Sequence, residues 1–213
     1  MAIWKTCSQQ EFTMKVLKEA IKNLSNKKQP GLDKIFPQFI KNLGSKARDT
    51  LLLVCNKFWT SKISLPIERT KAMIILILKP DKPKEEMESY RPIALTSNLE
   101  KDFKRIILTR LKWFLESQNL LVEGQVGFRN NMSTSNSLMR FVQVMKQGFN
   151  QKQSTLAVFM EFKGAYDMVW RSKLMGKLKM YRVRGNMQRW FGRFLAKRWV
   201  KVQWEEAESK YKQ

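Results

Sequence analysis

The sequence predicts a helix-rich α/β (α+β) fold, in one continuous domain or a piece of one. Several stretches repeat apolar residues at helical spacing, and four shorter stretches have the pattern of strands. The chain has 213 residues, of which 43% are hydrophobic, and its 13 Phe, 7 Trp and 12 Met can fill a core. No internal repeat or low-complexity linker divides the chain.

Helices and a basic loop are expected in the N-terminal part. A capping-box pattern followed by apolar residues at helical spacing predicts a helix over residues 8–24. The polar loop that follows, residues 26–33, carries Lys27, Lys28 and a Pro-Gly turn. Taken alone, it is typical of an ordinary connection between helices. Two further helices are expected over residues 37–43 and 45–59.

Two strands of a hairpin are predicted next, over residues 72–78 and 90–95. The first is a run of β-branched and long apolar residues, and a charged turn separates it from the second. Pro92 has no N–H to donate, so it places the second strand at a sheet edge or at the strand's start. The tip of this hairpin carries three cations, Lys79, Lys82 and Arg91. They could bind phosphate oxygens, or they could be solvated surface charges.

The long helix over residues 98–115 follows from an apolar face that persists along its whole length, and Ser97 or Asn98 can cap it. The other elements expected in the second half are helices over 134–150, 171–180 and 186–196, a strand over 199–204 and a frayed polar tail over 205–213.

The stretch from residue 155 to 170 is the candidate centre of chemistry. Residues 156–162 read as a buried strand that ends at a Lys-Gly break, so Glu161 lies near the strand's end and Asp167 in the following turn. A carboxylate there could hold Mg²⁺ together with water and a substrate phosphate. By spacing alone, a solvated rim of acids is the competing interpretation.

The charge of the chain favours a polyanionic partner. It has 41 Lys and Arg against 18 Asp and Glu, which gives a net charge of +23. We expect nucleic acid first and an anionic membrane surface second, because the basic residues are scattered rather than gathered on one amphipathic helix.

Several classes of chemistry are excluded by composition. With no histidine in the chain, Ser-His triads and His-ligated zinc are ruled out. The two cysteines, Cys7 and Cys55, are too few for a disulfide framework. No signal peptide and no apolar run of membrane-spanning length is evident, so we expect a soluble, intracellular chain in the nucleus or cytoplasm.

Five blocks, in order, resemble the reverse transcriptase domain of non-LTR (LINE-type) retrotransposons, especially jockey-like elements. Each block alone is weak evidence, and their shared order makes the resemblance specific. The blocks are KKQPGLDKI (27–35), ILKPDKP…ESYRPIALTSNLEKDFKRIILTRL (77–111), NLLVEGQVGFR (119–129), LAVFMEFKGAYDMVW (156–170) and RWFGRFLAKRWVKVQ (189–203).

The resemblance implies a right-hand RNA-directed DNA polymerase that acts on an RNA template, a DNA primer and nucleoside triphosphates. Residues of about 1–154 would form the fingers, 155–204 part of the palm, and 205–213 a polar tail. The resemblance places Arg91 and Lys79 or Lys82 over the triphosphate. We assign nucleic-acid binding to Lys27, Lys28 and Arg129.

The palm motif of the family is similar to the stretch around Glu161. By this resemblance Glu161 is the Mg²⁺-binding acid, Asp167 the accompanying acid, Tyr166 the aromatic beside the nucleotide sugar, and Phe162 a flanking residue. Two Mg²⁺ ions in such enzymes activate the 3′-hydroxyl and neutralise charge on the transferring phosphate.

Two departures from the family pattern lower the expected activity. Glu161 stands where the family has Asp, and one extra methylene displaces a Mg²⁺ ligand. The family's later palm motifs, a Gln-Gly loop and an Ala-Asp-Asp hairpin, have no counterpart after Trp204. We therefore expect a fragment truncated after the first palm motif and inactive alone. The alternatives are a non-catalytic, basic RNA/DNA-binding remnant, or a poorly soluble chain with unpaired apolar surface.

Overall fold

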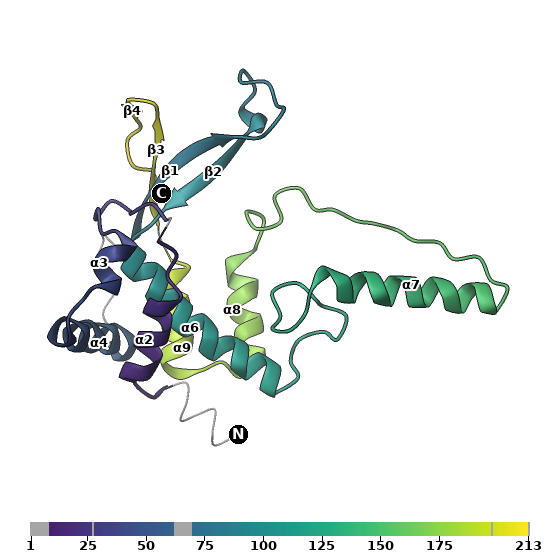
Figure 1. Cartoon of the computed structure of the whole chain (residues 1–213), viewed down its shortest axis with the longest axis horizontal. Helices are drawn as coiled ribbons and strands as arrows, with labels where there is room; N and C mark the ends of the chain where they lie inside the picture. The colour runs from purple at the N-terminus through teal and green to yellow at the C-terminus, as the bar shows by residue number, and fades with distance from the viewer. Residues whose placement is uncertain (1–8, 27, 62–69, 197, 213) are drawn as a thin grey trace. The chain divides into compact units, whose positions relative to one another are not determined.

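The computed structural model of the chain describes residues 9–26, 28–61, 70–196 and 198–212. The chain divides into two compact units, and Figure 1 traces their elements in chain order. The first unit is Met1–Arg110 with Met175–Gln213, and the second is Leu111–Leu174. The mixture of helices with one four-stranded sheet confirms the predicted α/β (α+β) class.

The helices of the N-terminal part are α2 (Met14–Lys22), α3 (Pro37–Lys41) and α4 (Ser45–Thr60). Pro37 opens α3, where its missing N–H costs no hydrogen bond. The apolar face predicted for α2 is confirmed, because Leu17, Ala20 and Ile21 are buried.

The prediction of one helix over residues 8–24 is wrong at its start. Ser8 lies outside the described residues, and α2 begins only after Thr13. Phe12 is 3% exposed, and its backbone N–H and carbonyl both bond to the side chain of Asn56, at 2.7 and 3.0 Å. These contacts hold Phe12 against Asn56 of α4, and Thr13 is extended (φ −96°, ψ 159°), so α2 starts later than the sequence pattern predicted.

The sheet of the first unit has the strand order β2-β1-β3-β4. Its strands are β1 (Lys71–Leu78), β2 (Tyr90–Leu95), β3 (Trp199–Trp204) and β4 (Ala207–Glu208). β1 pairs antiparallel with β2 and parallel with β3. The hairpin and the strand over residues 199–204 are therefore confirmed, and Pro92 lies in the edge strand β2, as predicted.

The tail does not fray as expected. After a turn at Glu205, whose φ is 51°, β4 pairs antiparallel with β3. Val200 also exchanges two backbone hydrogen bonds of 2.8 Å with Lys212. The physical reason is that the edge of β3 offers backbone partners that the polar composition of the tail does not reveal.

The core of the first unit gathers around α6 (Asn98–Ser117) and α9 (Gly185–Phe194). The ring of Phe103 on α6 meets Phe12 at 5.8 Å and Trp190 on α9 at 6.4 Å between centroids. Trp59 of α4 is fully buried and lies 5.0 Å from the Phe12 ring. Aromatic side chains from distant parts of the chain thus join the helices into one core.

The second unit contains α7 (Thr134–Asn150), and α8 (Arg171–Met180) runs from its end into the first unit. The bounds of α7 confirm the helix predicted over residues 134–150, and in its capping box the Ser133 backbone N–H donates to the Asn136 side chain at 2.7 Å. No residue of α7 is buried in the structure.

The strand predicted for residues 156–162 is wrong in this structure. This run is irregular, and among the described residues no backbone hydrogen bond involves residues 154–162. Leu156 and Phe159 are 89% and 84% exposed. Strand-forming residues need a neighbouring strand to pair with, and none of the four described strands takes this position.

Candidate nucleotide and nucleic-acid site

The end of this apolar run and the turn after it carry four predicted site residues, Glu161 and Phe162 in the run and Tyr166 and Asp167 in the turn. The backbone N–H groups of Asp167 and Met168 both donate to the carbonyl oxygen of Gly164, at 2.9 and 3.0 Å. Gly164 has a φ of 64°, a conformation that glycine adopts without strain. The side chains of Phe162 and Tyr166 are 77% and 78% exposed, so the turn presents both aromatics to solvent.

The acids of this turn form a partial set of metal ligands. Glu161 and Asp167 are both exposed, and Mg²⁺ usually takes one or two protein carboxylates with water and substrate phosphate. Across residues 9–26, 28–61, 70–196 and 198–212, no three Asp, Glu, Cys or His side chains gather where they could hold an ion. These residues do not fit the donor set that two catalytic metal ions require.

The β1–β2 hairpin positions the predicted triphosphate-binding cations. The Lys79 ammonium donates to the Glu88 carbonyl at 2.6 Å, and the Lys79 backbone N–H donates to the Ser89 carbonyl at 2.8 Å. Arg91 lies on β2 opposite Ile77 and is exposed, as is Lys82 in the turn. The hairpin thus carries all three cations, and the Lys79 side chain is fixed by its bond to the Glu88 carbonyl.

The loop that carries Lys28 is fixed against the start of α6. The fully buried Asn98 donates its side-chain amide to the Ile35 carbonyl at 2.8 Å and accepts a bond from the Lys101 ammonium at 3.3 Å. A Cβ on Gly31 would lie 2.6 Å from the backbone of residues 96 and 97. Lys28 itself is exposed, and Lys27 lies outside the described residues.

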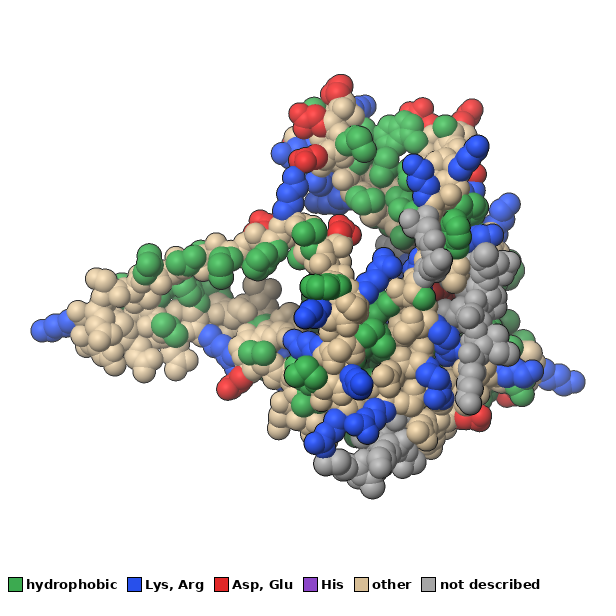
Figure 2. All heavy atoms as spheres, turned by 180° about the vertical axis from the view of Figure 1, so that it is seen from behind, with side chains coloured by type: hydrophobic (Ala, Val, Ile, Leu, Met, Phe, Trp, Pro, Cys, Tyr) green, Lys and Arg blue, Asp and Glu red, His purple; other side chains and the backbone are tan. Residues whose placement is uncertain are grey.

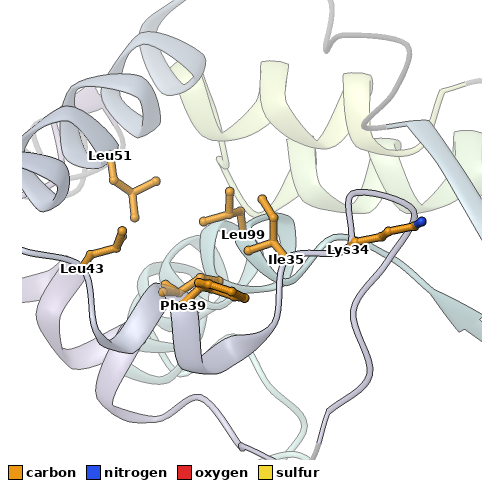
Figure 3. Close-up of a pocket in the computed structure, with 7 residues that line it drawn as sticks. Lys34, Ile35, Phe39, Leu43, Leu51 and Leu99 are labelled. Atoms are coloured by element: carbon orange, nitrogen blue, oxygen red, sulfur yellow. The ribbon is translucent and has the colours of Figure 1, made fainter.

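An apolar pocket of about 420 Å³ lies beside this loop. Figure 3 shows Leu43 and Leu51 on one side, facing Ile35 and Leu99, while the Lys34 amine points away from the group. The loop therefore contacts the helices through its apolar residues and presents its charges outward.

Arg129 is engaged within the second unit. Its guanidinium forms a two-point ion pair with Glu116, with nitrogen to oxygen distances of 3.0 and 2.6 Å. These bonds lower the pKa of Glu116 and raise the pKa of Arg129. Arg129 thus closes the segment between α6 and α7, and its role in nucleic-acid binding stays a prediction.

Two buried acids near the start of α6 were not singled out from the sequence. Glu100 is 4% exposed and accepts bonds from Lys104 at 3.0 Å and Arg198 at 3.2 Å. Burial raises the pKa of the Asp102 carboxyl to about 7, although the charges of Arg105 and Lys28 act against the shift. The sequence signal that could have identified these acids is a cation four positions after Glu100 and three positions after Asp102.

The surface charge matches the composition. Figure 2 shows Lys and Arg side chains spread over this face of the molecule rather than gathered in one patch. None of the described helices combines the length and apolarity needed to cross a membrane.

Sequence comparison identifies the class of protein to which a chain with this sheet and these helices belongs. Residues 77–213 match the family described as reverse transcriptase (RNA-dependent DNA polymerase). The match covers more than half of the chain, so the chain belongs to the reverse transcriptase family. Members of this family use divalent metal ions.

The similar curated proteins are RNA-directed DNA polymerases of non-LTR transposons, which confirms the resemblance. The chain is 37% identical to the probable polymerase from transposon BS and 34% identical to that from transposon X-element, both of Drosophila melanogaster, over 161 residues. It is 32% identical to the polymerase from mobile element jockey of Drosophila funebris over 167 residues. These matches span 76–78% of this chain and 18% of each relative.

Proposed function

We propose that the chain supplies the fingers, over about residues 1–154, and the beginning of the palm, over 155–204, of an RNA-directed DNA polymerase. The observation that carries this proposal is the β1–β2 hairpin, which carries three cations, Lys79, Lys82 and Arg91, and whose turn and second strand lie inside the matched range. Its partners are an RNA template, a DNA primer and nucleoside triphosphates.

The hairpin is the proposed triphosphate contact. The Arg91 guanidinium can grip two phosphate oxygens at once, and Lys82 acts as a point charge. Lys79 is fixed beside them by its bond to the Glu88 carbonyl. In the acidic turn, Glu161 and Asp167 are the proposed Mg²⁺ ligands, and the rings of Phe162 and Tyr166 are proposed to lie beside the nucleotide.

We propose that the described residues bind nucleic acid and nucleotide without polymerising on their own, because they offer too few carboxylates for two metal ions. Primer extension on an RNA template with Mg²⁺ or Mn²⁺ should give no incorporation. Template-dependent incorporation that is abolished by Glu161→Ala and kept by Glu123→Ala, a matched exposed acid, would overturn this part of the proposal.

Nucleotide binding separates the polymerase proposal from that of a non-catalytic, basic RNA/DNA-binding remnant. Titration with a fluorescent deoxynucleoside triphosphate should show affinity that falls about tenfold or more in Arg91→Ala, the loss of one charge-assisted contact. Lys46→Ala, on the exposed start of α4, is the matched control. Equal affinities in both variants would favour the remnant.

A further inference from the structure

The start of α6 ties two cations from separate elements into one arrangement. Asn98 holds the basic loop through the Ile35 carbonyl, at 2.8 Å, and holds Lys101 through a 3.3 Å bond to its own side-chain oxygen. Its side chain is inaccessible to solvent. One buried amide therefore fixes the loop and the lysine at the same time.

The backbone of the loop reinforces this arrangement. Gly31 lies so close to α6 that an added Cβ would approach the Ser97 nitrogen and the Thr96 carbonyl carbon to 2.6 Å. Real Cβ atoms do not approach a backbone this closely, so only glycine fits. Lys28 precedes this glycine by three residues, and its positive charge acts on both Lys101 and Asp102 of α6.

The charges at this place are unbalanced. Burial lowers the pKa of Lys101, and the positive charge of Lys28 lowers it further. Glu100 and Asp33 act in the opposite direction. The Glu100 carboxylate is already bonded to Lys104 and Arg198, which leaves Asp33 as the exposed acid beside the two lysines.

We propose that Lys28 and Lys101 bind one backbone phosphate of a nucleic-acid strand, and that Asn98 is the positioning residue of this site. The proposal rests on the proposed function and adds a contact to it. Two ammonium groups held by a rigid anchor repel each other, and an anion placed between them relieves the repulsion. Because ammonium groups contact phosphate oxygens and not base edges, the site is independent of sequence.

The test is the salt dependence of binding to a single-stranded RNA oligonucleotide. Each lost phosphate contact lowers the slope of log affinity against log salt by about 0.7. Lys28→Ala and Lys101→Ala should each lower the slope, and the double variant should lose less than the sum because both residues hold the same phosphate. Lys46→Ala is the control. If Lys28→Ala and Lys101→Ala lower the salt slope only as much as Lys46→Ala does, the proposal is overturned.

Asp33 provides a test of opposite sign. Its side-chain oxygen accepts the Ile35 N–H at 3.2 Å, so Asp33→Asn keeps the acceptor and removes the negative charge. RNA affinity should rise about twofold to tenfold at low salt. Asp49→Asn, an exposed acid on α4, controls for net charge. Equal gains in both variants would count against a phosphate near Lys101.

The role of Asn98 is tested separately from its contribution to stability. Asn98→Ala should lower the salt slope as Lys28→Ala does, measured under conditions where its circular dichroism matches the parent chain. A lower melting temperature with an unchanged slope would make Asn98 merely structural and overturn its assignment.

Two further outcomes locate any failure. Loss of triphosphate binding with unchanged RNA binding in the two lysine variants would overturn the assignment to a strand, because the phosphate would then belong to a nucleotide. Absence of RNA binding by the parent chain would overturn the proposed function as well, whereas RNA binding that is indifferent to all these variants overturns this inference alone.

Discussion

Asp102 is buried, and burial disfavours the charged form of its carboxyl group. Its side chain is 6% exposed, one carboxylate oxygen has no hydrogen-bond partner among the described residues, and Arg105 reaches the other at 3.4 Å. Burial raises its pKa from 3.8 to about 7. Between these two values the unfolded carboxyl releases its proton while the folded one keeps it, so stability falls as pH rises.

We predict that the free energy of unfolding decreases from pH 5.5 to pH 8 by on the order of 2 kcal/mol. No histidine titrates in this window, and comparison with Asp102→Asn isolates the contribution of Asp102. Urea denaturation at the two pH values measures it. Asp102→Asn should abolish the decrease and Asp49→Asn should keep it, whereas a decrease that survives in Asp102→Asn would contradict the raised pKa.

Phe12 anchors the segment before α2. Its ring contacts Trp59 and Phe103, and the Arg110 guanidinium lies 4.2 Å from the ring centroid. Phe12→Ala should lower the free energy of unfolding by about 3–5 kcal/mol, the usual cost of removing a buried aromatic ring. Urea denaturation followed by tryptophan fluorescence tests this value. Phe149→Ala, where the ring is 71% exposed, should change stability by less than about 0.5 kcal/mol.

At the scale of elements, the apolar run over residues 154–162 and β1 have similar compositions but differ in backbone hydrogen bonding. β1 is paired on both sides, by β2 and β3, whereas residues 154–162 form no backbone hydrogen bond with any other residue that the structure describes. Hydrogen exchange followed by mass spectrometry should show peptides from this run exchanging near the intrinsic rate and peptides from β1 protected. Protection of this run equal to that of β1 would show that it pairs in solution.

The elements that the sequence predicted are those with local causes. The apolar face of α6, the bounds of α7 and the Pro92 edge position follow from residues close together in the chain. The irregular run over 154–162 was wrongly predicted as a strand because strand formation depends on a partner that is distant in the sequence.

The candidate site shows the same division. Arg91 and Lys82 could be predicted because the hairpin that carries them is local. The bond from Asn98 to Ile35 joins residues 63 positions apart, and the local sequence around neither residue predicts it. The acids Glu161 and Asp167 were found from their place at the end of an apolar run and received their catalytic roles by resemblance, and the structure shows both exposed in an irregular segment.

For the whole molecule, net charge and exposed apolar surface oppose each other. The charge of +23 keeps copies of the chain apart at low salt. Val158, Phe159 and Met160 are consecutive and at least 71% exposed, and their backbone is free to pair with a second copy. Which effect dominates depends on ionic strength, because salt screens the repulsion and leaves apolar attraction in place.

We therefore predict that the monomer fraction at micromolar concentration falls as salt rises from about 50 to 500 mM, where the screening length shrinks to a few ångströms. Sedimentation velocity measures this fraction directly. Val158→Lys places a charge within the run and should keep the chain monomeric across the range. Met87→Lys adds the same charge at a residue that is 92% exposed in the hairpin turn, so it should associate as the parent chain does. Equal protection by both substitutions would show that net charge controls association and that the apolar run does not.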